Sequence, residues 1–364
     1  MIHAKGNSLF DQIGISRLGL ICGIAAAAMV VFSPSGPVQA QNLSGQTLRL
    51  YTYGGTYLEA VQEFVIKPFE AETGVKVTVD DGCCSKLGAA MAAGQYVGDV
   101  VLGQDFGTLL NEQKQGYLIP DKRLEEAAAS NGAPESFRTP GMLVLHVYAY
   151  IMAGSDPKAP MPQTWAEFWD TTKFPGTRGL IRGEPSPQLE AALLAAGTPA
   201  NKLYPLDADK AFNELDALRK KTKVLFAATG AEQINFLATG ETKYSMVFSN
   251  RMVLAANENI KLGYSYGQSL QVGNGGAILK GAKNVDAAVA FLRFHYRPEV
   301  LAKFAERTGL APAYKEAALK VSDARRPLMP TSPENTATAV QVNVDFWAKN
   351  RETLLKRWVQ WLAQ

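Results

Sequence analysis

Residues 48–59 read Leu-Arg-Leu-Tyr-Thr-Tyr-Gly-Gly-Thr-Tyr-Leu-Glu, and this stretch decides the fold. Its first half alternates apolar with polar side chains, which predicts a short strand. The two glycines allow a sharp turn, and apolar residues at helical spacing from Leu58 to Phe69 predict a helix. Thr56 and Glu59 have the spacing of a capping box. Free N–H groups at such a helix start can hold ligand oxygens, although an ordinary strand-to-helix turn has the same sequence signal.

The next segments repeat this alternation of strand and helix. Residues 75–79 and 98–103 have strand patterns, and residues 86–93 and 107–115 have helical ones. Short connections between such segments predict an α/β fold with a parallel sheet. Ligands bind at the carboxyl ends of the strands of such sheets. Taken singly, each of these loop residues is also explained as a turn residue without a ligand.

Two motifs carry a resemblance to a known family. The first is Pro68-Phe69-Glu70 followed by Thr73-Gly74, and the second runs from Pro162 through Thr164-Trp165 to Lys173-Phe174-Pro175-Gly176. Together they resemble the periplasmic solute-binding proteins of ABC importers, in the spermidine/putrescine-binding group (extracellular solute-binding family 1). The resemblance extends over about residues 47–364.

The resemblance implies a two-lobed periplasmic-binding-protein fold of type II. Each lobe would be a mostly parallel sheet flanked by helices, and crossover strands would join the lobes. The apolar run 141–153 fits such a crossover. We expect a signal peptide over residues 1–40, a first lobe over 41–149 and 272–312, and a second lobe over 150–271 and 313–364. A hinge is expected near 146–150 and 272–275.

The resemblance also implies a ligand cleft between the lobes. Loops at the carboxyl ends of the strands of both lobes would form its two walls. The candidate ligand-binding residues are Tyr53, Gly54, Gly55, Thr56, Tyr57, Cys84, Ser85, Asp105, Phe106, Glu184, Ser186, Thr229, Gly230, Arg251 and Asn274.

The candidate cleft departs from that of polyamine binders, which hold a polycation with aromatic walls and several acids. Asn274 stands where those proteins carry an aspartate, and Gly54-Gly55-Thr56 replaces an aromatic residue and an acid. Arg182 and Arg251 add positive charge. This balance favours a zwitterionic or anionic amino compound. The alternative is a polyamine such as spermidine or putrescine.

The N-terminus has the form of a secretory signal peptide. Lys5 and Arg17 precede an apolar run over 18–32, and Val38-Gln39-Ala40 is a small-residue cleavage site. Cleavage after about Ala40 would release the chain into the periplasm. An uncleaved anchor is the alternative, and the run is short for one.

Composition restricts the partners. Of the 364 residues, 47% are hydrophobic and 20% are charged, which is typical of a globular protein large enough for two cores. The net charge is +3 without a run of Lys or Arg, so nucleic acid is not indicated as a partner. We expect a monomer that binds a small solute and meets a membrane permease, or alternatively a chemosensory partner.

The remaining cysteines of the expected mature chain, Cys83 and Cys84, are adjacent. They would form either a strained vicinal disulfide or two free thiols. No metal-ligand spacing accompanies them, so neither a metal nor another cofactor is predicted.

One motif suggests an enzyme. Gly263-Tyr264-Ser265-Tyr266-Gly267 matches a nucleophile elbow, and Asp286 and His295 follow in the order of a hydrolase triad. The flanking residues do not have the strand-then-helix pattern that an elbow needs. We therefore predict no enzyme activity and keep a secreted serine hydrolase using Ser265 as a remote alternative.

Overall fold

The computed structural model describes residues 43–83, 85–95 and 98–364. Within them lies an 11-stranded sheet whose main path has the order β2-β1-β3-β9-β5-β8-β6-β7. The strands are β1 (Thr47–Tyr51), β2 (Lys76–Asp80), β3 (Val100–Asp105), β4 (Arg138–Thr139), β5 (Met142–Gly154), β6 (Arg178–Ile181), β7 (Val224–Ala227), β8 (Tyr244–Phe248), β9 (Gly263–Ile278), β10 (Ala311–Pro312) and β11 (Val340–Gln341).

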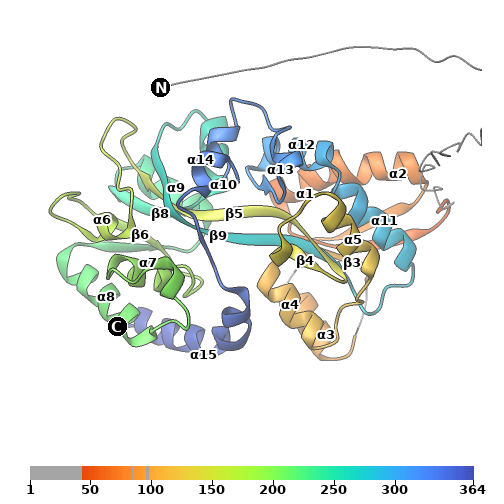
Figure 1. The fold of residues 1–364 in the computed structure, drawn as a ribbon, viewed down its shortest axis with the longest axis horizontal. Coiled ribbons are helices and arrows are strands. Elements are labelled where there is room, and N and C mark those ends of the chain that lie inside the picture. The colour runs from red at the N-terminus through yellow and green to blue at the C-terminus, as the bar shows by residue number, and fades with distance from the viewer. Residues whose placement is uncertain (1–42, 84, 96–97) are drawn as a thin grey trace, which may run out of the picture. The chain divides into compact units, whose positions relative to one another are not determined.

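Helices flank this sheet (Figure 1). The α-helices are α1 (Gly55–Val61), α2 (Lys67–Thr73), α3 (Ser85–Ala92), α4 (Phe106–Lys114), α5 (Lys122–Ser130), α6 (Trp165–Trp169), α7 (Gln188–Ala195), α8 (Ala208–Lys221), α9 (Gly230–Ala238), α10 (Ser249–Asn257), α11 (Val285–His295), α12 (Pro298–Thr308), α13 (Lys315–Ala318), α14 (Pro333–Thr336) and α15 (Val344–Leu362). Shorter turns are the π-helix η1 (Gln62–Ile66) and the 3₁₀-helices η2 (Glu135–Phe137), η3 (Ala200–Lys202) and η4 (Arg326–Leu328).

Two groups of parallel strands lie on either side of a central antiparallel pair. β1 pairs in parallel with β2 and β3, and β6 pairs in parallel with β7 and β8. Between these groups the long strands β5 and β9 run antiparallel (Figure 1). The arrangement confirms the predicted α/β class, and the apolar run 141–153 forms the crossover strand β5, all of which is buried.

The two segments predicted as a hinge pair with each other. Tyr148 stands opposite Val272, and His146 stands opposite Asn274. Glycines in β9 let the neighbouring strands approach. A Cβ added at Gly275 would lie 2.2 Å from the Leu143 carbonyl oxygen, so no other residue fits there without a shift of the backbone.

The start of the first helix differs from the prediction. α1 begins at Gly55 with Gly54 as its N-cap, and no side chain caps it. The Thr56–Glu59 capping box is therefore wrong, because the glycines turn the chain into the helix one residue before Thr56 could act as a cap. By contrast, the Thr164 hydroxyl accepts a hydrogen bond from the Glu167 N–H at 3.1 Å, as its spacing predicts.

The C-terminal helix α15 is held through its tryptophans. Trp347, Trp358 and Trp361 are each at most 7% exposed, as their spacing on an amphipathic helix predicts. Their indole N–H groups donate to the Glu190 carboxylate, the Arg182 carbonyl and the Asp216 carboxylate respectively. α15 is thereby anchored to the strand ends and helices of the second parallel group.

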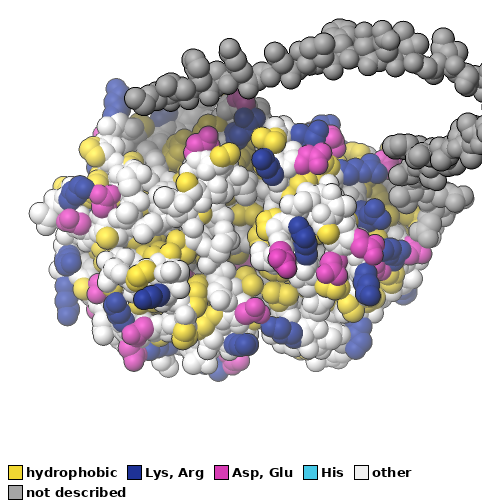
Figure 2. All heavy atoms as spheres, in the orientation of Figure 1, with side chains coloured by type: hydrophobic (Ala, Val, Ile, Leu, Met, Phe, Trp, Pro, Cys, Tyr) yellow, Lys and Arg dark blue, Asp and Glu magenta, His cyan; other side chains and the backbone are white. Residues whose placement is uncertain are grey.

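Among the described residues, no helix is long and apolar enough to cross a membrane. The predicted signal peptide lies outside those residues. On the face shown in Figure 2, acidic and basic side chains are interspersed, which agrees with the small net charge.

Candidate functional site

An acidic side chain stands at the end of β3. Asp105 is exposed, yet burial by the surrounding protein raises its pKa to about 6. A side chain that solvent reaches but protein surrounds lies in a recess, so both observations hold together. The Tyr148 hydroxyl of β5 donates to Asp105 Oδ1 at 2.8 Å. Asn274 is opposite Asp105 in the β3–β9 pairing, and its Oδ1 is buried without a partner among the described residues.

Aromatic rings extend from this acid toward β8. The centroid of Tyr148 lies 5.6 Å from that of Tyr150 and 5.9 Å from that of Phe248. Tyr53, at the end of β1, is 43% exposed, and burial raises its pKa to about 12, with Asp105 as a further cause. Aromatic faces beside a carboxylate suit a cationic group such as an ammonium.

A cation, Arg251, lies in the first turn of α10, three residues after Phe248. The Arg251 Nε is buried and has no hydrogen-bond partner among the described residues, and burial lowers the pKa of its guanidinium. A Cβ added at Gly230 would lie 2.1 Å from this Nε, so Arg251 packs directly on the first residue of α9. A guanidinium beside a helix N-terminus places two positive groups together, and this arrangement favours a bound anion. Glu232 in the first turn of α9 is engaged by the Ala228 N–H at 2.6 Å.

Glu184, a further predicted acid, is already neutralised. Its carboxylate pairs with Arg351 of α15, and the charges of both residues act on Asp105. The backbone carbonyl of Arg182 accepts a hydrogen bond from the Trp358 indole, and the Arg182 side chain is exposed. Asp105 therefore remains as the acid available to a bound cation at this end.

Other predicted residues make hydrogen bonds or packing contacts within the protein. The Thr229 hydroxyl caps α9 by accepting from the Glu232 N–H, and Ser186 donates to Glu190 at 3.3 Å. Phe106 is 3% exposed and packs edge-on against Phe137 at 5.8 Å. Tyr57 packs on Phe304 at 5.2 Å.

The first loop leads directly into α1. Gly55 is exposed, whereas Gly54 and Thr56 are half-buried. Ser85 begins α3, while Cys84 lies outside the described residues. Cys83 takes part in a disulfide bond, which favours the disulfide over free thiols at this position.

A family model described as bacterial extracellular solute-binding protein matches residues 65–331. The chain belongs to this family. It is 31% identical over 360 residues to the gamma-aminobutyric acid-binding protein of Pseudomonas aeruginosa, covering 96% of this chain and 97% of that one. The resemblance drawn from the sequence motifs is thus confirmed.

Solved structures of solute-binding proteins have the same fold. The structure of the Atu4243–GABA receptor is 28% identical, covers 87% of this chain and 97% of that chain, and has a TM-score of 0.79. A substrate-binding protein of an ABC transporter from Bradyrhizobium japonicum is also 28% identical, with coverages of 87% and 99% and a TM-score of 0.78. These neighbours are two-lobed periplasmic binding proteins, which confirms the predicted fold class. The chain is a substrate-binding protein of the kind that serves ABC importers.

The polyamine alternative gains no support from the comparisons. A spermidine/putrescine-binding protein from Streptococcus pneumoniae is 16% identical with a TM-score of 0.68, a likeness that shows the fold alone. Nor do the described residues include a group of three or more His, Cys, Asp or Glu side chains placed to hold a metal ion.

The residues of the candidate site that sequence reasoning missed are aromatic. Tyr148 and Tyr150 were placed only in a hinge, and Phe248 was not among the predicted ligand-binding residues. Alternate tyrosines in a crossover strand next to the hinge are a signal that could have revealed them, because alternate residues share one face of a strand.

The hydrolase alternative has no matching geometry. Ser265 lies inside β9 rather than at a strand-to-helix turn, and its hydroxyl, 2.9 Å from Gln163 Oε1, is part of a hydrogen bond there. Asp286 pairs with Arg123 at 2.7 Å, and His295 is buried against Phe304 at 5.2 Å. Each member of the suggested triad thus has a different structural partner.

Proposed function

We propose that the protein captures gamma-aminobutyric acid (GABA), or a closely similar short ω-amino acid, for an ABC importer. The observation that carries this proposal is the arrangement of Asp105, an aromatic wall, and Arg251 in that order. Asp105 would hold the ammonium group, and Arg251 with the N-terminus of α9 would hold the carboxylate.

The aromatic wall separates the two charges. Phe248 contacts Tyr148, which binds Asp105, and Arg251 follows Phe248 by three residues. A ligand that reaches both charges needs a spacer between its amine and its acid, which an α-amino acid lacks. Two of the relatives described above carry GABA in their names, and that agrees with a short flexible spacer.

The expected mechanism is closure about a hinge. The strand ends of the two parallel groups would form opposite walls of a cleft, with lobes divided at the boundaries given above and β5 and β9 as the hinge. A solute held by both walls would favour the closed form, which a membrane permease would then recognise. The signal peptide, periplasmic location and monomeric state remain part of this proposal.

The test is calorimetric titration of the purified protein with GABA, butyrate, butylamine and putrescine. We expect saturable binding of GABA, and affinities at least about 100-fold weaker for butyrate and butylamine, because each leaves one buried charge unpaired. Unchanged GABA recovered after incubation would agree with a binding protein. Tight binding of putrescine without binding of GABA would overturn the proposal in favour of a polyamine ligand.

A further inference from the structure

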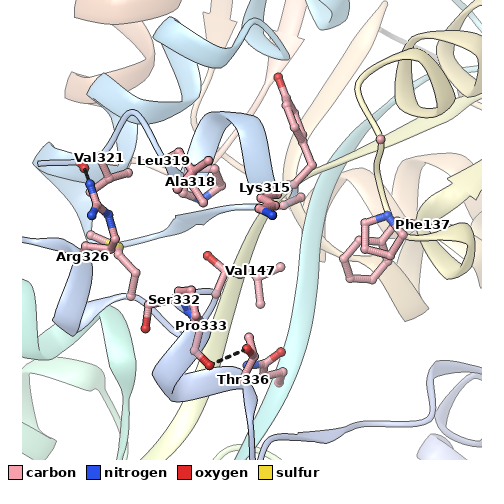
Figure 3. A pocket seen from close by; sticks show the side chains of 18 of the residues that line it. Phe137, Val147, Lys315, Ala318, Leu319, Val321, Arg326, Ser332, Pro333 and Thr336 are labelled. Atoms are coloured by element: carbon pink, nitrogen blue, oxygen red, sulfur yellow. Dashed lines mark hydrogen bonds between the residues drawn. The ribbon is translucent and has the colours of Figure 1, made fainter. Parts of the chain in front are cut away.

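A cavity of about 580 Å³ lies at the crossover strands and is not part of the site described above. We call it the hinge cavity. Figure 3 shows labelled residues around it, including Phe137 after α5, Val147 of β5, Lys315 of α13, and Ser332 and Thr336 near α14. Its walls therefore come from segments that lead into both parallel groups of strands. Its volume is within the range of small-molecule sites.

The hinge cavity and the candidate solute site lie on opposite faces of β5. Val147 lines the cavity, and its neighbour Tyr148 points to Asp105. Successive residues of a strand point to opposite faces, and the β5–β9 register is regular at these two positions. A molecule in the hinge cavity would therefore not compete directly with a solute beside Asp105.

The charges around the cavity favour a monoanion. Among the described residues no Asp or Glu lines it, whereas Lys315 and Arg326 do. Arg326 already pairs with Asp323 at 2.8 Å. Lys315 is exposed and has no ion-pair partner in the described part of the chain, so its positive charge at the cavity rim is available to a ligand.

Buried polar groups of the lining also lack partners. Ser332 is 2% exposed, and its hydroxyl has no hydrogen-bond partner among the residues that the structure describes. The Thr331 hydroxyl and the Arg326 Nε are unpartnered in the same sense. A buried hydroxyl without a partner is costly, so a ligand oxygen that accepts from it would be stabilising. The remaining wall is largely apolar, with Phe137, Val147 and Met329 among its members.

We propose that the hinge cavity binds a monocarboxylate with an apolar chain or ring, and that this second ligand opposes closure around the solute. The carboxylate would lie near Lys315 and the Ser332 hydroxyl. The apolar body would lie along Phe137 and Val147.

The second half of this proposal rests on the proposed function and on contacts of the cavity walls. Phe137 packs against Phe106, the residue after Asp105. On the other side, Gln271 of β9 donates to the Pro330 carbonyl at 2.8 Å and accepts from Gln341 at 2.7 Å. When a hinge bends, residues on one face of the hinge strands approach and those on the other face separate. A ligand that touches both walls keeps the spacing seen here, in which Asp105 and Tyr53 are exposed.

The site is tested by titrating the purified protein with octanoate, using octylamine and octanol as matched probes. We expect octanoate to bind at one site per chain, and octylamine not to bind. Lys315→Met should weaken octanoate at least about tenfold, because it removes the uncompensated charge. Lys320→Met is the matched control, since Lys320 is exposed like Lys315 but does not line the cavity and pairs with Glu299, and it should leave octanoate binding unchanged.

A second pair of variants locates the bound octanoate. Arg251→Met should weaken GABA binding by about 100-fold or more and keep octanoate binding, whereas Lys315→Met should weaken octanoate by about tenfold or more and keep GABA binding. Loss of octanoate in Arg251→Met would place it in the solute site and overturn the proposal. Equal binding of octylamine, or no binding of octanoate, would also overturn it. The octanoate titrations do not depend on GABA. They therefore test the hinge cavity even if GABA proves not to be the solute.

The coupling is tested by measuring GABA affinity with and without saturating octanoate. We expect GABA to bind at least about fivefold more weakly with octanoate present, and octanoate to weaken by the same factor with GABA present. In Lys315→Met, about tenfold more octanoate should be needed for the same effect on GABA affinity. An unchanged GABA affinity at a saturated hinge cavity would overturn the coupling while leaving the site.

Discussion

The acid end and the cation end of the candidate site are built in different ways. Asp105 is exposed and already accepts a hydrogen bond from Tyr148. The Arg251 Nε is buried, has no partner among the described residues and packs on Gly230 at the start of a helix. The acid end is thus satisfied without a ligand, while the cation end is not. We therefore expect the carboxylate of a bound ligand to contribute more to affinity than its ammonium, because the carboxylate supplies a partner that Arg251 otherwise lacks.

The largest expected effect comes from removing the cation. Arg251→Met should weaken GABA binding by about 100-fold or more, because the ligand carboxylate then loses its charged partner in a desolvated site. Titration calorimetry measures this directly. Arg307→Met is the matched control, since its guanidinium pairs with Glu59 on the surface at 3.1 Å. An equal loss in both variants would show that Arg251 acts through stability rather than through the ligand.

Part of this site could be predicted from the sequence, because the spacing of strands and helices places Asp105 and Arg251 at strand ends. The state of each charge could not. Asp105 depends on Tyr148, 43 residues away, and Glu184 is neutralised by Arg351, 167 residues away. Such pairs depend on how distant elements pack.

Helix caps could be predicted better than these long-range pairs, because a cap depends on residues close together in the sequence. The Thr229–Glu232 spacing is that of a capping box, and the Thr229 hydroxyl accepts from the Glu232 N–H as the motif requires. The Glu232 carboxylate accepts instead from the N–H of Ala228, one residue before the N-cap, at 2.6 Å. Thr229 was also predicted to be a ligand-binding residue, and that prediction stays untested beside its role as a cap. The long strand β9 was not predicted as a strand, and only its residues 272–275 were expected to be part of a hinge. Its first half carries the polar residues Ser265 and Gln268 and pairs with β5 far along the chain.

A methyl group at Gly230 should have the next largest effect. The added Cβ of Gly230→Ala would lie 2.1 Å from Arg251 Nε, so the flexible guanidinium must move away from the helix N-terminus. We expect GABA to bind about 30-fold more weakly, which corresponds to roughly 2 kcal/mol for a lost charge-assisted hydrogen bond. Gly183→Ala is the control, because nothing lies within 4 Å of its added Cβ. Equal affinity of Gly230→Ala and the parent protein would contradict the role of this contact.

The acid end predicts a dependence on pH. The pKa of Asp105 is raised to about 6 in the free protein, and a bound ammonium would lower it. Below pH 6 the carboxyl must lose a proton before GABA binds, so affinity should fall by up to about tenfold between pH 6 and pH 5 and be nearly constant above pH 7. Titrations at several pH values measure this. Asp105→Asn should bind weakly at every pH without this slope, and a slope that persists in Asp105→Asn would assign the proton to another group.

The raised pKa of Asp105 also makes the stability of the free protein depend on pH, and this dependence has the opposite sign to that of ligand affinity. Because the folded pKa of Asp105 lies above its ordinary value of 3.8, the folded chain holds the proton more tightly than the unfolded chain does. The contribution of Asp105 to stability is therefore fully present below about pH 4 and is lost as pH rises through 6. Ligand affinity and this stability term thus change in opposite directions over one pH window.

The smallest effect should come from the support of the acid. Tyr148→Phe removes the hydroxyl that donates to Asp105 Oδ1 and stabilises its charged form. We expect about fivefold weaker GABA binding at neutral pH, roughly 1 kcal/mol, and a shift of the pH midpoint to a higher value. Tyr264→Phe, with a ring 38% exposed elsewhere on β9, is the control and should change neither quantity. The pH midpoint distinguishes two roles of Tyr148. A merely structural role would weaken GABA binding without changing the midpoint, whereas a hydrogen bond to the Asp105 carboxylate must change both the affinity and the midpoint.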